Sequence, residues 1–288
     1  MVHVRVVELA GRQRNRISRE QLVGLGLGRH AIEHAIASGA LVAVAPAVFA
    51  IPPVLDDARA RWKGATLTAP NTYLSRLCAA SAWGFWGIAV KTETVVRPGG
   101  HGTRRYGRLL VHHSRTLHGE TTTLNGVPIT KPGRTLIDIA PLISGRALAR
   151  CVREAVRLRR IGVGGIAETL ERHRGRRGTA KLSGVLARYA GLPIERARSA
   201  TEVEALRVLL DAGRPMPALN IEVAGVEADL VFPDQRLIIE IDGPDFHQDV
   251  GEDLRKELVW RDAGWSVRRI AAADIDAGGR LLLGRAPG

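Results

Sequence analysis

Residues 226–242 read V-E-A-D-L-V-F-P-D-Q-R-L-I-I-E-I-D, which is two apolar β-type runs joined by the turn Pro233-Asp234. Asp229 lies inside the first run, and Glu240 and Asp242 lie at the end of the second. Residues two apart on a strand project from the same face, so Glu240 and Asp242 should emerge together. If the turn makes the runs an antiparallel pair, Asp229 and Glu240 lie almost opposite one another.

Carboxylates on the apolar strands of a sheet are destabilising unless another group balances their charge. Like charges at this separation also raise the pKa of one partner. A divalent cation is the simplest balance, and Mg²⁺ (or Mn²⁺) prefers carboxylate oxygens together with waters and substrate phosphate. The pattern predicts a metal site on Asp229, Glu240 and the strand carbonyl before Asp242, which would activate water against a phosphodiester. The alternative for Asp242-Gly243 is a simple strand-ending turn.

The flanking sequence completes a mixed α/β pattern. Apolar periodicity predicts one helix before the two runs, and a helix and a strand after them, over residues 201–212, 251–263 and 265–270. The set resembles the PD-(D/E)XK nuclease superfamily, and more closely the small family related to the very-short-patch-repair endonucleases. The resemblance is carried by S-A-T-E (199–202), E-A-D-L-V-F (227–232), R-L-I-I-E-I-D-G (236–243), F-H (246–247), D-L-R-K-E (253–257) and A-G-W-S-V-R-R (263–269). It implies a restriction-endonuclease-like α/β/α domain over residues 199–288.

The resemblance also implies roles for the acidic residues. Glu202 is the carboxylate of the first helix, and Asp229 and Glu240 are the metal ligands. Asp242 occupies the position where the superfamily usually has Lys, which is a departure that bears on cleavage. For Glu202, an ordinary solvated acid on a helix surface is the alternative.

Two further residues enter the predicted catalytic set through the resemblance. His247 is the general base or a phosphate contact, and a surface-loop histidine is its alternative. Lys256, or Arg255 beside it, supplies the missing cation from the following helix.

Residues 1–55 show the order helix, helix, hairpin. Ser18 and Gln21 have the spacing of a capping box and open a short helix. A second helix is expected over residues 28–38, and the run 41–51 is β-rich with a Pro in its middle. This pattern is typical of a winged helix-turn-helix.

The exposed side of the second helix should face the major groove of DNA. Its predicted contacts are Arg29, His30 and His34. Glu33 on the same helix repels phosphate, so a helical packing or dimerisation module is the alternative.

The charge of the chain is divided unevenly. Residues 61–199 carry 25 Lys or Arg against 7 Asp or Glu, whereas residues 200–288 carry 10 against 17. A basic block of this kind is a candidate surface for duplex DNA, because neutralised phosphates release counterions. Its predicted contacts are Arg157, Arg159 and Arg160. A general preference for Arg on solvated surfaces is the alternative.

Residues 60–195 are expected to form an Arg-rich α/β domain. Helices are predicted over residues 71–83, 134–140, 145–160, 164–173 and 179–190, and strands over 92–97 and 109–113, with a loop over 98–107. The stretch G-V-P-I-T-K-P-G-R-T-L-I-D-I-A (126–140), placed behind a winged helix, resembles the AbiEi-type antitoxins, which are abortive-infection regulators. The resemblance implies a transcriptional autorepressor of a toxin–antitoxin locus, with a cognate nucleotidyltransferase-like toxin as its partner.

The composition excludes several classes of protein. Hydrophobic residues make up 45% and charged residues 25%, which is ordinary for a folded soluble chain. Aromatic residues make up 4%, which argues against binding of single strands by base stacking. The two cysteines, Cys78 and Cys151, build no disulfide framework, so the cytoplasm is the expected location. The longest apolar stretch, residues 41–55, contains three prolines and is too short to span a bilayer, so no membrane partner is expected.

The sequence thus predicts an α+β multidomain protein that binds double-stranded DNA and carries a metal-dependent endonuclease-like domain at its carboxyl end. The alternative is a non-enzymatic, antitoxin-like repressor in which an inactive nuclease fold is a scaffold. A nuclease directed at RNA is a third possibility.

Overall fold

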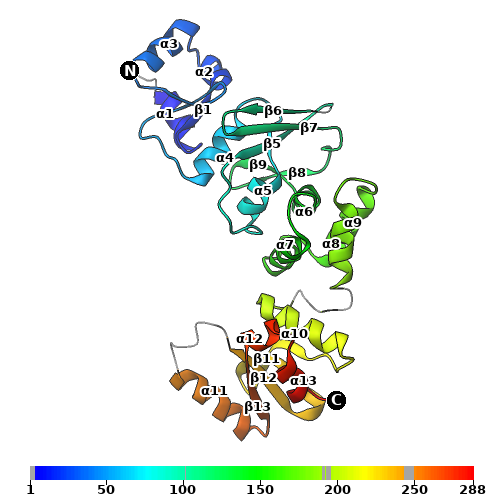
Figure 1. Ribbon diagram of the computed structural model, residues 1–288. Helices are drawn as coiled ribbons and strands as arrows, with labels where there is room; N and C mark the ends of the chain where they lie inside the picture. The colour runs from blue at the N-terminus through cyan, green and yellow to red at the C-terminus, as the bar shows by residue number, and fades with distance from the viewer. Residues whose placement is uncertain (1–3, 101, 190–191, 193–195, 243–249) are drawn as a thin grey trace. The chain divides into compact units, whose positions relative to one another are not determined.

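The computed structural model describes residues 4–100, 102–189, 192, 196–242 and 250–288. The chain is a mixed α and β protein with three sheets, as expected for an α+β multidomain fold (Figure 1). Its contacts divide it into two units, residues 1–151 with 168–182, and residues 152–167 with 183–288. None of the described helices is long and apolar enough to cross a bilayer.

The amino-terminal segment consists of three helices and a small antiparallel sheet of order β1-β3-β2. Its elements are α1 (Val4–Gly11), β1 (Arg16–Ser18), α2 (Arg19–Gly24), α3 (Arg29–Ala37), β2 (Val42–Ala45) and β3 (Val48–Ala50). The predicted capping box is present, since Gln21 N donates to Ser18 Oγ at 3.1 Å and Ser18 N donates to Gln21 Oε1 at 3.0 Å. Fully buried Ile17, Leu22 and Ile32 join these elements into one core.

The middle segment is built on a mixed six-stranded sheet of order β6-β7-β5-β4-β9-β8. Its elements are α4 (Ala58–Thr66), β4 (Tyr73–Leu74), α5 (Arg76–Trp83), β5 (Glu93–Pro98), β6 (Thr103–Tyr106), β7 (Leu109–Ser114), β8 (Thr121–Leu124), β9 (Val127–Thr130) and α6 (Pro132–Ile139). The loop predicted over 98–107 is wrong in part, because it contains β6. All four residues of β6 are exposed at the sheet edge, so the strand has no apolar alternation to reveal it.

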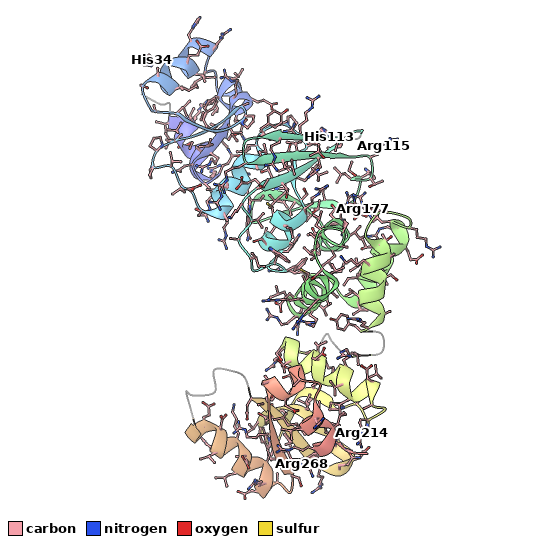
Figure 2. The ribbon with its side chains drawn as sticks, viewed as in Figure 1. His34, His113, Arg115, Arg177, Arg214 and Arg268 are labelled. Atoms are coloured by element: carbon pink, nitrogen blue, oxygen red, sulfur yellow. The ribbon has the colours of Figure 1, made fainter. Side chains whose placement is uncertain are left out.

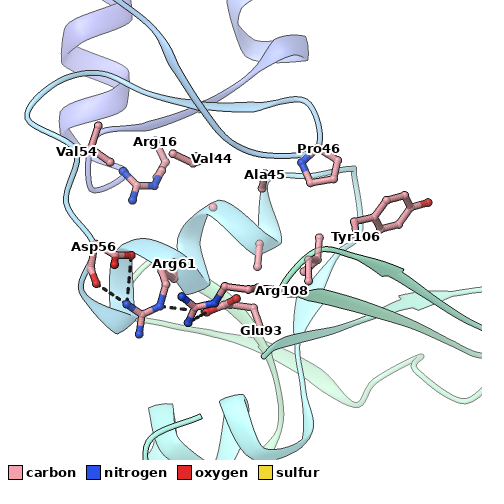
Figure 3. A pocket seen from close by; sticks show the side chains of 13 residues that line it. Arg16, Val44, Ala45, Pro46, Val54, Asp56, Arg61, Glu93, Tyr106 and Arg108 are labelled. Carbon is pink, nitrogen blue, oxygen red and sulfur yellow. Dashed lines mark hydrogen bonds and ion pairs between the residues drawn. The ribbon is translucent and has the colours of Figure 1, made fainter. Parts of the chain in front are cut away.

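A charged network links α4 to the start of β5 in this sheet (Figure 3). Arg61 Nε lies 3.1 Å from Glu93 Oε1, and Arg108 Nη2 lies 3.6 Å from the same oxygen. Arg61 Nη1 also pairs with Asp56 Oδ1 at 3.3 Å. These pairs line a pocket together with Arg16, which donates to the carbonyl of Leu55. Both acids of the pocket are therefore engaged by arginine.

The stretch 126–140 forms β9 and α6 and is part of the core. Trp83 Nε1 donates to the carbonyl of Thr130 at 2.9 Å. Arg134 is 1% exposed, and its Nε lies 3.0 Å from both carboxylate oxygens of Asp138. Arg134 Nη1 also donates to the carbonyl of Thr116 at 2.7 Å. The polar residues of this motif thus hold α6 against the sheet.

A larger residue at Gly133 in the same helix would collide with Thr169. A Cβ built there would lie 2.4 Å from Thr169 Oγ1 and 3.0 Å from Thr169 Cβ. Gly133→Ala should therefore lower the free energy of unfolding by about 1–3 kcal/mol. Gly145→Ala, which meets no atom within 4 Å, is the matched control in urea denaturation. Equal midpoints for the two variants would show that Thr169 moves aside freely.

Three helices connect the middle segment to the carboxyl-terminal one: α7 (Gly145–Arg157), α8 (Val163–Arg172) and α9 (Thr179–Ala187). The apolar face predicted for the first is confirmed, because Leu148, Val152, Ala155 and Val156 are all buried.

The carboxyl-terminal segment has a four-stranded sheet of order β10-β11-β12-β13, antiparallel except for the parallel pair β12 and β13. Its elements are α10 (Ala200–Asp211), β10 (Ala218–Val223), β11 (Val226–Phe232), the 3₁₀ turn Pro233–Gln235, β12 (Leu237–Asp242), α11 (Val250–Asp262), β13 (Ser266–Ala271), α12 (Ala272–Asp276) and α13 (Arg280–Arg285). Trp260 of α11 is 1% exposed and packs on Val231 and Ile238. The strands β10 and β11 form a hairpin, in which Ala224 and Gly225 turn the chain with φ of 51° and 82°.

Candidate active site

Asp229 and Glu240 lie together on the neighbouring strands β11 and β12. The ladder between these strands pairs Leu230 with Ile239. Beyond that pair the carboxylates act as acceptors: Asp229 N donates to Glu240 Oε1 at 2.9 Å, and Ile241 N donates to Asp229 Oδ2 at 2.9 Å. The prediction that the turn after Phe232 brings the two acids together is confirmed.

Both acids are held away from their ionised forms. Burial raises the pKa of Asp229, while the hydrogen bond from Ile241 N lowers it and the charge of Glu202 raises it further. Burial, followed by the charge of Asp229, raises the pKa of Glu240 to about 7. The charges of Arg269 and Lys256 act in the opposite direction. The pair is therefore an unfavourable place for two negative charges without a further cation.

Asp242 follows Glu240 by two residues but has a different partner. Arg269 Nε of β13 lies 3.1 Å from Asp242 Oδ1, and Arg269 Nη2 lies 3.1 Å from Asp253 Oδ2. Burial raises the pKa of Asp242, and the charge of Arg269 opposes that rise. Asp242 is thus part of an ion-pair network with β13 and α11, and is more than a strand-ending turn.

Glu202 of α10 is buried at 6% exposure, so the solvated-acid alternative is wrong. Its Oε2 accepts from Asn220 Nδ2 at 2.7 Å and from Arg198 N at 2.8 Å. Its charge acts on Asp229 strongly enough to raise the pKa of that group. Glu202 therefore lies near the acidic pair, with one oxygen occupied by these two donors.

The last two predicted catalytic residues follow β12. His247 lies outside the described residues. Lys256 of α11 has its Nζ 3.9 Å from Glu252 Oε1, and its charge lowers the pKa of Glu240. Lys256 thus contributes positive potential at the pair, although its ion pair is with its own helix.

The donor set fits a divalent cation through two carboxylates. Asp229 Oδ1 and Glu240 Oε2 accept no hydrogen bond from any described residue, so each acid keeps one oxygen for a ligand. Within the described part of the chain, no group of three or more His, Cys, Asp or Glu side chains is close enough to hold a metal ion. A cation here would complete its shell with water and substrate oxygens, as Mg²⁺ commonly does.

The predicted DNA contacts on α3 are at the surface. Arg29 Nε donates to Glu33 Oε1 at 2.8 Å, and His30 Nδ1 lies 3.7 Å from Glu33 Oε2. His34 is exposed (Figure 2). Glu33 therefore partly neutralises the helix that is expected to meet phosphate.

The predicted contacts at the carboxyl end of α7 are also exposed. Arg157 pairs with Glu154 at 2.7 Å, and this hydrogen bond raises the pKa of Arg157. Arg159 and Arg160 are exposed beyond the helix end. These residues present positive charge to solvent, with part of it balanced locally.

Two uncharacterized proteins of Mycobacterium tuberculosis, from strains CDC 1551 / Oshkosh and H37Rv, are each 30% identical to the chain over 176 residues. No family model matches the chain. The aligned part is 58% of this chain and 62% of each relative, so the chain spans less than two thirds of the curated relatives it matches. The function proposed for the chain therefore rests on its own residues.

Sequence reasoning assigned no role to Arg269 or Asn220. The register pairs Arg269 with Glu240 on the parallel strands β13 and β12. Asn220 lies on β10 and reaches Glu202 of α10. Arg269 ends the stretch 263–269 that carries the resemblance. It reaches Asp242 because β13 pairs in parallel with β12.

Glu240→Gln should flatten the pH dependence of unfolding in this segment. The folded pKa of about 7 lies above the ordinary value of 4.5, so the proton on Glu240 stabilises the fold. That contribution is fully present below pH 4.5 and is lost as the pH rises through about 7. Between pH 4.5 and about pH 7, the urea midpoint should fall for wild type and stay level for Glu240→Gln. Glu222→Gln, exposed on β10, should keep the wild-type slope, and a level slope in both would contradict the assignment.

Proposed function

We propose that the chain binds duplex DNA and hydrolyses or nicks phosphodiesters with a divalent metal ion held by Asp229 and Glu240. The observation that carries this proposal is the pair of half-buried carboxylates on adjacent strands, both with raised pKa values. Two ionised carboxylates in such a pair destabilise the fold, and a bound cation would stabilise them by balancing their charge. The order of α10, the antiparallel strands β10 to β12, α11 and the parallel strand β13 agrees with the nuclease-like domain implied by the resemblance.

Each residue has a defined task in this proposal. Asp229 and Glu240 would hold the metal, which when bound would supply Lewis acidity toward the phosphodiester and toward water. Glu202 orders α10 and β10 through Asn220 and adds negative potential behind Asp229. Lys256 supplies positive potential on the substrate side.

The amino-terminal segment supports DNA binding. Its order α1, β1, α2, α3, β2, β3, with β2 and β3 as an antiparallel hairpin, agrees with the order expected of a winged helix-turn-helix. In this interpretation α3 enters the major groove and the hairpin is the wing. The Arg residues after α7 add sequence-independent attraction.

One observation favours the alternative of an antitoxin-like repressor with an inert nuclease scaffold. Asp242 stands where the superfamily usually has Lys, and it is ion-paired to Arg269. Such a repressor would bind its own promoter, with a nucleotidyltransferase-like toxin as its partner, and would not cleave. The two functions differ in whether the acids take up metal.

Calorimetry with Mn²⁺, followed by nicking of supercoiled plasmid in Mg²⁺ or Mn²⁺, tests the proposal on the full chain. We expect saturable Mn²⁺ binding and nicked circles that EDTA abolishes. Absence of Mn²⁺ binding together with salt-sensitive duplex binding would support the repressor. Cleavage of RNA in preference to plasmid would assign the same site to RNA.

Glu33→Gln should tighten duplex binding. The substitution removes a negative charge from α3 and releases Arg29. A unit charge about 4 Å from a phosphate is worth about 1 kcal/mol in water, so affinity should rise about five-fold at low salt. Anisotropy titrations at about 50 and 200 mM salt measure the change. Glu8→Gln on exposed α1 removes the same charge; an equal gain there would mean that net charge, and not α3, controls binding.

A further inference from the structure

A further polar pocket lies in the middle segment. It has a volume of about 220 Å³, and its lining includes Ser75 and Arg76 at the start of α5, His112 of β7, Arg134 and Asp138 of α6, and Arg176. His113 and Arg177, labelled in Figure 2, also line it. The motif at residues 126–140 thus lines one side of a pocket that has no role in the proposed nuclease activity.

Two buried polar groups that line this pocket have no partner. Ser75 is 2% exposed and its Oγ makes no hydrogen bond within the described residues. His112 is 7% exposed; its Nδ1 bonds Thr103 Oγ1 at 2.9 Å, but its Nε2 is unpaired within the same residues. An unpaired buried polar group costs about 1–3 kcal/mol, so a ligand that gave either group a hydrogen-bond partner would be stabilised by it.

The positive charge of the pocket is only partly balanced. Asp138 is the one acid among the lining residues described, and it is shared by Arg134 at 3.0 Å and Arg176 at 2.9 Å. Arg76 is half-buried and makes no hydrogen bond or ion pair with a described residue. Burial lowers the pKa of Arg76. An anion placed beside this guanidinium would relieve that cost.

The start of α5 adds to this field. Ser75 is the N-cap residue, and its hydroxyl does not cap the helix. The first N–H groups of a helix and its dipole both favour an anion at this end. The N-cap hydroxyl that would ordinarily bond those groups is therefore left for a ligand.

We propose that this pocket binds a phosphate group, held by Arg76, the Ser75 hydroxyl and His112 Nε2. Four arginines against one acid favour an anion, and the several oxygens of a phosphate can accept from more of these donors than a carboxylate can. The pocket is smaller than the about 300–1,000 Å³ of drug-sized ligand sites, so it takes a single phosphate group and not a whole cofactor. Two sources share this chemistry: a small phosphate monoester, and a phosphate of the DNA backbone.

The state of His112 agrees with this role. Burial, followed by the charge of Arg76, lowers the pKa of His112 to about 4, so the ring is neutral at physiological pH. When Thr103 donates to Nδ1, the proton lies on Nε2, which donates to the phosphate. The site thus offers hydrogen bonds from neutral groups and charge from Arg76.

The test titrates inorganic phosphate into the full-length protein, with thermal unfolding and the His112 side-chain NMR signals as readouts. We expect saturable shifts of His112 and a rise in the melting temperature. Arg76→Asn should weaken binding about ten-fold or more. Asn is used because Arg76 has a φ of 53°, which Asn tolerates. Arg14→Asn, at a φ of 59°, is the matched control and should bind like wild type.

Ser75→Ala separates a ligand role from a structural one. Since the Ser75 hydroxyl is unpaired, its loss should leave the phosphate-free protein as stable as wild type or more so, and yet weaken phosphate binding. No saturable shift of His112, or equal binding by Arg76→Asn and Arg14→Asn, would overturn the proposal.

Competition identifies the source of the phosphate. If duplex DNA displaces inorganic phosphate, the site holds the DNA backbone; if both bind together, it holds a separate phosphate monoester. Either result supports a phosphate site. None of these measurements depends on Asp229, Glu240 or cleavage, so failure here leaves the nuclease proposal untouched.

Discussion

Asp229→Asn should abolish Mg²⁺-dependent nicking and leave the carboxyl-terminal sheet folded. Loss of an outer-shell partner of a metal commonly costs about 10–100-fold, so loss of a direct ligand should cost at least that much. The amide of Asn still offers an oxygen to Ile241 N, so the closure of β11 on β12 survives. Plasmid nicking measures the loss of cleavage, and Mn²⁺ calorimetry on the same preparation measures the loss of metal binding. Glu240→Gln should lose both as well.

The variant has an internal check on folding. Because burial raises the pKa of Asp229, removing its charge should leave the urea midpoint at neutral pH unchanged or higher. Glu222→Gln, exposed on the neighbouring strand, should nick like wild type. If Asp229→Asn nicks as fast as Glu222→Gln, the cleavage belongs to a contaminant and the two acids are structural.

Arg134→Ala should destabilise the unit of residues 1–151 and 168–182 more than a substitution of any surface residue there. Its guanidinium is 1% exposed, and it binds Asp138, the Thr116 carbonyl and Ser114 Oγ. Removing one partner of a buried ion pair typically costs about 3–5 kcal/mol. Since Arg176 still pairs with Asp138, the loss should lie near 3 kcal/mol, at the lower end of that range.

Chemical denaturation with far-ultraviolet circular dichroism measures this loss. Arg150→Ala, exposed on α7, is the control and should change stability by less than about 0.5 kcal/mol. A loss for Arg134→Ala as small as that of the control would show that the buried pair adds nothing to folding.

Local signals in the sequence predicted local structure well. Ser18 and Gln21 form the capping box that their spacing indicated. The predicted pairing of Asp229 with Glu240 is confirmed, because one short turn fixes the register of two strands. Periodicity also located α7 and its buried face.

The remaining features depend on contacts that the spacing of residues along the sequence does not predict. The hairpin at Ala224 places a residue other than Gly at positive φ, which the sequence does not indicate. The phosphate pocket joins Ser75 with His112, which are far apart in the sequence and meet only because the sheet brings β7 beside β5. Arg269 meets Asp242 for the same kind of reason, through the parallel strand β13.

The proton on Glu240 gives the proposed metal centre a dependence on acidity. With a pKa of about 7, neutral solution contains both protonated and ionised molecules in comparable amounts. An incoming cation must displace that proton, so uptake acidifies the medium and its apparent affinity increases with alkalinity until Glu240 is fully ionised. Calorimetry in buffers of different ionisation enthalpy would count the released protons directly.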